Sequence, residues 1–408
     1  MGLVKSSKLL EEELMKYGPL FGDFETVPWL ISPDWFEITK SQLEELQSIG
    51  SVLRKFLMTC DNLYYEDEDA RNIVEQNKSD KTLHFQRRQM RGELPILVRP
   101  DMVITNDGFK IVELEVLVGG IGEVPAVKEA YLSIVPPSRP YNGSMVNSFV
   151  RAMEQIPGDG RMDRTLLVTS FPTRFPELKI FSKLCRDRGY ETLPMRLEDI
   201  YGIDDDCAKL IWRLFDVDDI EELKHIPNIP ISPPLKQFLQ EKAWLGILHD
   251  PGYEDYWESN LGQDFHLLKN STAKTWILRK GYMPPTDELK NLPKSKRRYV
   301  TKLSDSWGSR SFTYWPEKSG RQWNRFLSDV PEGNSLYIMQ EYQDSLKFSF
   351  PAYVNGKISY LENLRALITP YYFFVGEKAE LADIQVTLRK SRKVHGATDS
   401  IIVPVSIK

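Results

Sequence analysis

Apolar residues recur every three to four positions in the first part of the chain. The run follows Thr39 and Gln42, which are spaced as in a capping box. Its apolar members are Leu43, Leu46, Ile49, Val52, Leu53, Phe56 and Leu57. This spacing places them on one face of an amphipathic helix. The pattern predicts that residues 1–95 form a mainly helical N-terminal region.

The spacing changes to that of strands beyond residue 95. Residues 98–118 contain two apolar runs separated by Asn106-Asp107-Gly108, a sequence typical of a tight turn. A glycine-rich loop follows at 119–122, and residues 123–132 have the pattern of a helix. The pattern therefore predicts a β-hairpin, a loop and a helix in this order.

Charged residues interrupt the predicted hairpin in a regular way. Glu113 and Glu115 stand two positions apart in the second strand, and Arg99 and Asp101 do so in the first. Side chains along a strand alternate between its faces, so both glutamates leave the sheet on the same side, and the hairpin can bring the other two residues near them. Several acids and an arginine on one sheet face are costly to bury unless they bind a cation or a phosphate.

Strands and helices alternate in the next segment. A short buried strand at 165–170 precedes a helix at 175–189 and strands at 191–195 and 209–215. This alternation predicts a small open α/β domain with parallel strand pairs. The segment has no Gly-x-Gly-x-x-Gly fingerprint, which argues against a dinucleotide site. Arg213 lies within the last of these strands, either salt-bridged or directed at a ligand.

The last part of the chain begins with helices and continues with strands. Helices are expected to about residue 280, and Asn355-Gly356 marks a hairpin. The expected strands are 299–303, 336–340, 348–354, 357–362 and 401–407.

Composition limits the class of protein. The chain has 408 residues, of which 41% are hydrophobic and 27% charged, with a net charge of −5, as in an ordinary globular protein. It has no long basic block for nucleic acid, and its five histidines lack the spacing of a zinc site. Three cysteines fit a reducing compartment, no apolar run approaches the roughly 20 residues of a membrane span, and residues 1–16 lack a signal-peptide core. We expect a cytoplasmic protein that binds neither nucleic acid nor a membrane.

A strand lysine indicates a possible phosphate site. Lys302 stands in an apolar strand that leads into a loop of small residues. Hydroxyls and backbone N–H groups in such a loop can surround a phosphate, and the lysine adds a point charge. An ordinary exposed turn is the alternative interpretation. The loop residues of interest are Ser306, Trp307, Gly308 and Ser309.

A second apolar strand ends in polar residues. Gln340, Glu341 and Tyr342 follow Leu336–Met339. Backbone groups and one amide at this point can face the edge of a purine, whereas the alternative is a strand that simply leaves the core.

Taken together and in this order, these segments resemble the circularly permuted ATP-grasp proteins, in particular the synthetase domain of glutathionylspermidine synthase. That family has Arg-x-Asp, then Glu-x-Asn beginning twelve residues after the aspartate, then a loop with glycine. Here Arg99 and Asp101 are followed by Glu113 and Glu115 at the same offsets and by Gly119–Gly122.

The resemblance also covers the lysines and the strand end. A family lysine in an element with an apolar helix is matched by Lys274 in Ala273–Leu278, and the family's strand lysine is matched by Lys302. The adenine hinge is matched by residues 340–342.

The resemblance implies an α/β (α+β) protein with a circularly permuted ATP-grasp fold. It would contain an open α/β pre-ATP-grasp-like domain and a helical N-terminal region. The expected parts are 1–95, the helical region; 96–160, the metal-binding half of the core; 161–235, the small α/β domain; and 236–408, the nucleotide-binding portion.

The resemblance also implies a reaction. ATP would phosphorylate a carboxylate, and an amine would attack the acyl phosphate to form an amide or peptide bond with release of ADP and phosphate. The substrates would be a small-molecule or peptide carboxylate and an amine, with ATP and Mg²⁺ as cofactors. The alternatives are another phosphoryl-transfer activity on the same fold and a nucleotide-binding protein without catalytic activity.

The residue roles follow from the same resemblance. The expected ligands of Mg²⁺ are Asp101, Glu113 and Glu115. The expected nucleotide contacts are Lys274, Lys302, Ser306, Trp307, Gly308, Ser309, Gln340, Glu341 and Tyr342. Arg99 would stabilise the transferring phosphoryl group. Arg365 would hold the acyl phosphate or the substrate carboxylate, and a surface salt bridge is the alternative for it.

Two positions depart from the family pattern. Glu115 stands where the family usually has asparagine, which adds negative charge to the proposed metal site. Lys274 and Lys302 are also closer in sequence than the corresponding lysines of the synthase.

Overall fold

Two long strands, β13 (Lys357–Val375) and β14 (Lys378–Arg389), form the centre of a seven-stranded sheet in the computed structural model of the chain. The strand order is β1-β15-β14-β13-β2-β3, and β12 pairs with the first half of β13. The pairs are antiparallel, except that β1 and β15 are parallel. The structure describes all residues except 1, 19–26, 221–225, 280–285, 306–310 and 331–334. The other strands of this sheet are β1 (Phe36–Ile38), β2 (Leu97–Thr105), β3 (Gly108–Glu115), β12 (Lys347–Val354) and β15 (Ile401–Ile407).

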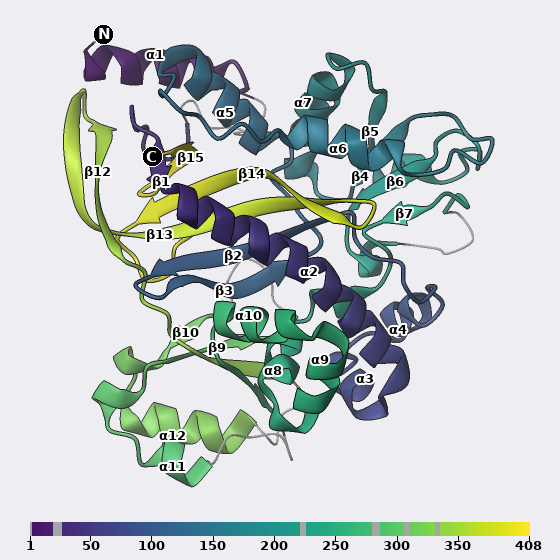
Figure 1. Cartoon of the computed structure of the whole chain (residues 1–408), viewed down its shortest axis with the longest axis vertical. Coiled ribbons are helices and arrows are strands. Elements are labelled where there is room, and N and C mark those ends of the chain that lie inside the picture. Colours follow the sequence, from purple (N-terminus) through teal and green to yellow (C-terminus); the bar gives the residue numbers. More distant parts are fainter. Residues whose placement is uncertain (1, 19–26, 221–225, 280–285, 306–310, 331–334) are drawn as a thin grey trace.

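Helices cover both faces of the central sheet. Tyr372 and Phe373 are successive residues of β13, so their side chains point to opposite faces. Tyr372 packs against Gly50 of α2, which lies across the strands in Figure 1. Phe373 packs against Phe149 of α6, with the ring centroids 6.1 Å apart. The helices in these layers are α2 (Lys40–Glu66), α5 (Glu123–Ile134) and α6 (Met145–Glu154).

The predicted N-terminal helix is confirmed. The Thr39 hydroxyl accepts a hydrogen bond from the Gln42 N–H at 3.2 Å, and the Gln42 amide oxygen accepts one from the Thr39 N–H at 2.9 Å. The apolar face of α2 is buried from Leu46 to Leu57, as its spacing predicts. No helix of the described ranges, α2 included, combines the length and the apolar composition of a membrane span. The neighbouring helices are α1 (Leu3–Met15), α3 (Glu68–Val74) and α4 (Asp80–Gln86).

A second sheet has four parallel strands in the order β5-β4-β6-β7. The predicted alternation of strands and helices in this segment is confirmed. Arg213 is buried on β6, and its guanidinium donates to the carbonyl oxygens of Pro233, Pro234 and Phe215 at 2.7–3.1 Å. It therefore stabilises the connection after β7, which is neither of the two roles expected for it. The elements are β4 (Thr165–Thr169), α7 (Phe175–Arg186), β5 (Thr192–Arg196), β6 (Leu210–Leu214) and β7 (Ile231–Ser232).

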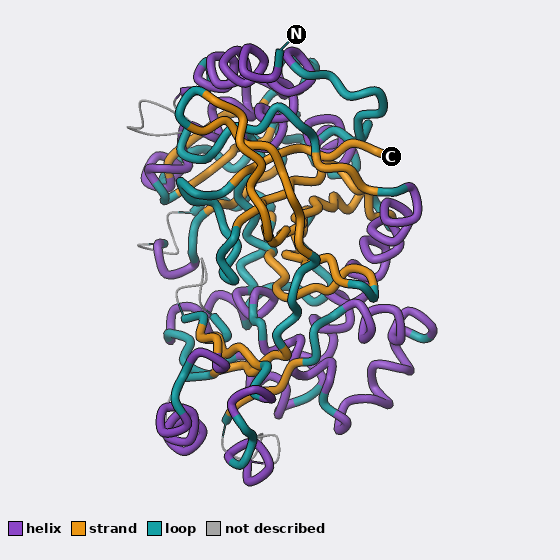
Figure 2. The backbone as a smooth tube through the Cα atoms, turned by 90° about the vertical axis from the view of Figure 1, so that its left-hand side faces the viewer, coloured by secondary structure: helices purple, strands orange, loops and turns teal. Residues whose placement is uncertain are grey.

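A third sheet is antiparallel, in the order β10-β9-β11-β8, and lies at the end of the molecule away from both termini (Figures 1 and 2). On β8, Ile277 packs against Gly246 of α8, while the next residue, Leu278, belongs to a core with Leu289 and Trp323 of α11 and α12. This sheet is therefore also covered on both faces. Its strands are β8 (Thr275–Leu278), β9 (Tyr299–Leu303), β10 (Thr313–Tyr314) and β11 (Tyr337–Glu341).

The helices of this part flank the third sheet, and short 3-10 helices fill several connections. The α-helices are α8 (Ala243–His249), α9 (Glu254–Leu261), α10 (Gln263–Ser271), α11 (Thr286–Lys290) and α12 (Gly320–Asp329). The 3-10 helices are η2 (Pro172–Arg174), η3 (Leu197–Ile200), η4 (Val217–Asp219), η6 (Gln237–Gln240), η7 (Pro251–Tyr253), η8 (Lys294–Lys296) and η9 (Trp315–Glu317).

Most of the predicted strands are present, but several of them begin or end at other residues than predicted. The 98–118 hairpin is present, although β3 ends at Glu115. The strand expected at 357–362 continues to Val375, and the sequence analysis did not predict β14. The pattern predicts helices to about residue 280, and the resemblance predicts a helix around 273–278. Both predictions are wrong at Thr275–Leu278, which forms β8. The division into four parts and the circular permutation stay predictions.

Gly50→Ala is expected to destabilise the protein, although alanine favours a helix over glycine by about 1 kcal/mol. A Cβ atom at this position would overlap the ring of Tyr372, so the helix or the sheet must shift. We expect the free energy of unfolding in urea to fall by about 1–3 kcal/mol, the range of overpacked cores. Ser51→Ala, at an exposed position of the same helix, is the control and should lower stability by no more than about 0.5 kcal/mol. Equal stability of the Gly50 variant and the wild type would contradict this packing.

Candidate active site

The β2–β3 hairpin brings Arg99, Asp101, Glu113 and Glu115 together on one face. Arg99 pairs with Glu115 across the ladder, and Asp101 pairs with Glu113. The Arg99 guanidinium forms an ion pair with Glu115, and its Nε lies 3.8 Å from Asp101 Oδ1. That Nε is buried and has no hydrogen-bond partner among the described residues. The convergence that strand alternation predicts is therefore present.

Two lysines from other parts of the chain face Glu113. Lys302 of β9 places its Nζ 3.6 Å from one carboxylate oxygen and donates to the Val112 carbonyl at 3.0 Å. Lys242, immediately before α8, places its Nζ 3.0 Å from the other carboxylate oxygen. All three side chains are at most 12% exposed, so these are buried ion pairs.

Burial and the neighbouring charges act in opposite directions on the acids. Burial raises the pKa of Asp101 and that of Glu115, and Arg99 offsets only part of this effect. Burial also raises the pKa of Glu113, but Lys302 and Lys242 more than offset it and leave that pKa below its usual value. Glu113 is thus the acid whose ionised form the protein stabilises.

Except for Lys302, which contacts Glu113 but is not part of the lining, these residues line a cavity of about 490 Å³. Residues of β2, β3, β13 and β14 form one wall of the cavity. Residues 171–174, after β4, and residues 394–396, between β14 and β15, line other parts of it. The charged and polar residues of its lining are Arg99, Asp101, Glu113, Glu115, Glu123, Thr173, Arg174, Gln240, Lys242, Thr369, Tyr371, Gln385, Thr387 and His395.

The glycine-rich loop at 119–122 packs tightly beside the hairpin. The Gly119 carbonyl accepts hydrogen bonds from Arg99 at 3.0 Å and from the Tyr371 hydroxyl at 3.4 Å. Gly120 has a φ of +89°, and a Cβ there would overlap the Tyr371 hydroxyl. Glycine at this position allows the loop to approach Arg99 and Tyr371 closely, which holds Arg99 in place.

The structure does not bring Lys274 into this cavity. Its side chain is exposed at the start of β8, and its Nζ lies 5.1 Å from the centroid of the Trp276 ring. Lys242 was missed in the sequence analysis, although the sequence carries a signal for it: the lysine precedes the apolar run Ala243–Leu248. A lysine before an apolar helix is the pattern that had been matched to Lys274.

The end of β11 lies beside β8 and β9. Gln340 is buried and donates its amide to the Thr275 hydroxyl at 3.0 Å. The N–H of Glu341 donates to the Lys274 carbonyl at 2.9 Å. The Tyr342 ring lies 4.7 Å from that of Tyr314. The loop residues Ser306, Trp307, Gly308 and Ser309 lie outside the described residues.

Arg365 lies at a separate place. Its Nε donates to Asp344 at 3.0 Å, and another nitrogen donates to the Lys390 carbonyl at 2.7 Å. It lines a different, more open cavity with Arg392 and Lys393, and the cavity at the hairpin does not include it. The salt bridge that was the alternative for Arg365 is the arrangement in the structure.

Asp101→Asn is expected to stabilise the ligand-free protein at pH 8. The pKa of Asp101 is raised to about 7, so between pH 4 and pH 7 the folded state binds more protons than the unfolded chain, and stability falls as pH rises through this window. Asparagine removes this effect. In urea denaturation without nucleotide or Mg²⁺, the variant should exceed the wild type by about 1–3 kcal/mol at pH 8 and by less at pH 4.

The control is Asp107→Asn, at an exposed position in the turn of the same hairpin. It should leave the pH dependence of stability unchanged. Parallel pH profiles for the wild type and Asp101→Asn would contradict the raised pKa.

Comparisons with known proteins give a likeness of fold. No family model and no curated protein matches the chain. Among solved structures, a glutathione synthetase-like effector (GSS30) from Globodera pallida, determined in its apo form, matches with a TM-score of 0.61. The match covers 99% of this chain and 97% of that one at 11% sequence identity. The chain therefore has a mixed α/β fold similar to that of a glutathione synthetase-like protein, along almost its whole length.

Proposed function

We propose that this protein is an ATP-dependent carboxylate–amine ligase of the ATP-grasp type, which forms an amide bond through an acyl phosphate and releases ADP and phosphate. The observation that carries the proposal is the convergence of carboxylates and cationic side chains: all but Lys302 line one cavity, and Lys302 pairs with Glu113 of that lining. Arg99, Glu113 and Glu115 come from the central hairpin, whereas Lys242 and Lys302 come from the segments around the third sheet. A triphosphate with a divalent cation needs both kinds of group, cationic side chains for the phosphates and carboxylates for the metal.

The acids suit a magnesium ion that arrives with the nucleotide. No group of three or more potential side-chain ligands is arranged to hold a metal ion within the described ranges. Mg²⁺ is commonly bound by one or two carboxylates together with phosphate oxygens and water, which does not require such a group. Glu113 and Glu115 would supply these carboxylates, with Asp101 beside them. The bound ion would neutralise phosphate charge.

Lys242 and Lys302 would neutralise the phosphates from the opposite side. Their ammonium groups now share Glu113 and would exchange it for phosphate oxygens. Lys242 replaces Lys274 in this proposal because it faces the acids and precedes a helix. It also lies further from Lys302 in sequence, which lessens one departure from the family pattern.

Arg99 would act on the transferring phosphoryl group. It lines the cavity and is held by Glu115, the Gly119 carbonyl and Tyr371. A fixed donor aimed at developing negative charge is an effective form of electrostatic catalysis. The carboxylate and amine substrates would meet in the rest of the cavity, near Glu123 and Arg174.

One observation favours a second candidate, a nucleotide-binding protein without ligase activity. Glu115 brings an additional negative charge beside Asp101, and it already forms an ion pair with Arg99. If that ion pair persisted in the nucleotide complex, Arg99 would be less able to stabilise the phosphoryl group.

Lys242→Ala and Lys302→Ala are each expected to weaken Mg²⁺-dependent ATP binding about 10- to 100-fold, since a charge-assisted hydrogen bond contributes about 1.5–3 kcal/mol. Lys274→Ala, at the exposed lysine, should change the affinity by less than about twofold. Isothermal titration calorimetry with ATP and Mg²⁺ measures all three variants. Loss of binding in Lys274→Ala, with retention in Lys242→Ala, would reverse the assignment.

Product analysis separates the ligase from the other candidates. A ligase forms ADP and phosphate in the presence of both an acid and an amine, and the amide appears in equal amount. A phosphorylated acceptor as the final product would indicate another phosphoryl-transfer enzyme. Tight binding of ATP without turnover in any mixture would indicate the binding protein.

A further inference from the structure

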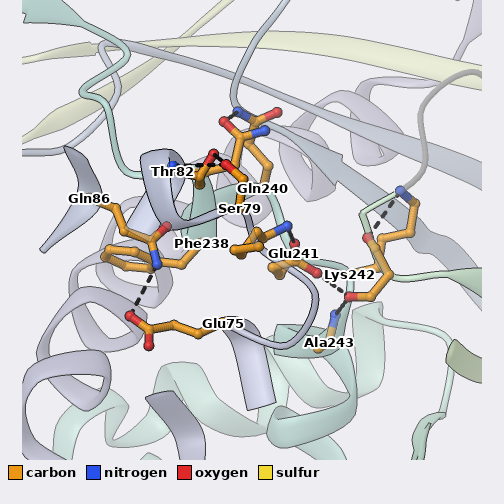
Figure 3. A network of polar contacts seen from close by, with 12 residues as sticks. Glu75, Ser79, Thr82, Gln86, Phe238, Gln240, Glu241, Lys242 and Ala243 are labelled. Atoms are coloured by element: carbon orange, nitrogen blue, oxygen red, sulfur yellow. Dashed lines mark hydrogen bonds and ion pairs between the residues drawn. The ribbon is translucent and has the colours of Figure 1, made fainter. Parts of the chain in front are cut away.

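One charged side chain of the N-terminal helical region forms an ion pair next to a residue of the proposed nucleotide site. Lys78, between α3 and α4, forms an ion pair with Glu241, and the two side chains are 6% and 2% exposed. Glu241 is followed directly by Lys242, whose ammonium group faces the cavity. Figure 3 shows Glu241, Lys242 and Ala243 in a network of polar side chains that also includes residues of the α3–α4 segment, among them Glu75 and Gln86.

Glu241 is also bonded to the strand that carries the second lysine. Its carboxylate accepts a hydrogen bond from the hydroxyl of Ser304, which directly follows β9. The Ser304 hydroxyl oxygen accepts from the Ala243 N–H at 3.0 Å, and the Ser304 carbonyl accepts from the Lys242 N–H at 3.2 Å. Ser304 is 1% exposed. These bonds fasten the end of β9 to the first turn of α8, and so fix the elements of Lys302 and Lys242 relative to each other.

Lys78 is the cation that forms an ion pair with the buried carboxylate of Glu241. An isolated buried carboxylate is strongly unfavourable, and it either takes up a proton or moves toward water. Either change would alter the hydrogen bond to Ser304 and the start of α8. Lys78 is not part of the cavity lining, and its ion pair with Glu241 connects it to Lys242 and Ser304.

We propose that Lys78 and Glu241 are positioning residues for the two phosphate-binding lysines, and that the N-terminal helical region thereby sets the affinity of the site for Mg²⁺-ATP. The inference deepens the function proposed above and rests on it. It also gives the α3–α4 segment a role in the site, although this segment supplies no residue to the cavity.

A second buried ion pair offers a matched control. Lys236, just before η6, places its Nζ 2.6 Å from Asp61 of α2, and both side chains are fully buried. It also ties the N-terminal helices to the segment that leads to α8. The described contacts of its ammonium group are with Asp61, the Glu93 carbonyl and the Tyr65 ring, and they include neither Lys242 nor Ser304.

The experiment compares two double variants, each of which removes a buried ion pair without leaving an isolated charge. The affinity for ATP with Mg²⁺ is measured by calorimetry on the full chain, and urea denaturation gives the folded fraction. Lys78→Met/Glu241→Gln should weaken binding about 10- to 100-fold, the usual effect of groups that orient a ligand's direct contacts. Lys236→Met/Asp61→Asn should bind within about twofold of the wild type once corrected for the folded fraction.

A third variant tests the proposal even if Lys78→Met/Glu241→Gln does not fold. Ser304→Ala removes only the hydroxyl that links Glu241 to β9, and it should also weaken ATP binding. Equal affinity in Ser304→Ala and the wild type would overturn the inference, as would equal affinity in the two double variants. Absence of Mg²⁺-ATP binding by the wild type would instead refute the proposed function.

Discussion

The cost of burying carboxylates on one face of the β2–β3 hairpin is the constraint on which the candidate site depends. Asp101, Glu113 and Glu115 lie within a sheet that is covered on both faces, and ionised groups are tolerated there only with cations close by. Arg99 comes from the hairpin itself, but Lys242 and Lys302 come from segments far away in sequence. Neutralising the hairpin therefore requires that the third sheet and α8 dock beside it. Lys242 also lines the cavity.

The local part of this arrangement was accessible from the sequence. The alternation of side chains along a strand predicts that Glu113 and Glu115 share a face, and the Asn106–Gly108 turn predicts that Arg99 and Asp101 oppose them. The capping box and the apolar face of α2 follow from rules that involve only residues three or four positions apart. Such features depend on short-range geometry, so a single sequence contains enough information to predict them.

The rest of the fold and of the candidate site depends on long-range contacts that a single sequence does not reveal. The apolar run at 275–278 is too short for its period to distinguish a strand from a buried helix, and the resemblance favoured the wrong one. Lys274 was selected through that error. Lys242 also precedes an apolar run, but only the structure, which places it against Glu113, distinguishes it from Lys274. Arg213 shows the opposite case. A buried arginine in a strand has the composition of a ligand site, yet three backbone carbonyls satisfy it.

The charges around the cavity also bear on how the proposed complex of Mg²⁺ and ATP would bind. Glu113 forms ion pairs with both lysines, and Glu115 forms one with Arg99, so each cationic side chain proposed to bind phosphate has a carboxylate beside it. On binding of Mg²⁺-ATP, the carboxylates would exchange their cationic partners for the metal ion. The cationic side chains would exchange the carboxylates for phosphate oxygens. Nucleotide without metal would take the cations and leave buried carboxylates uncompensated, which is strongly unfavourable. Glutamate at position 115, where the resemblance expects asparagine, increases this penalty by a further charge. Under the proposed function, this pattern of charges would favour binding of metal and nucleotide together.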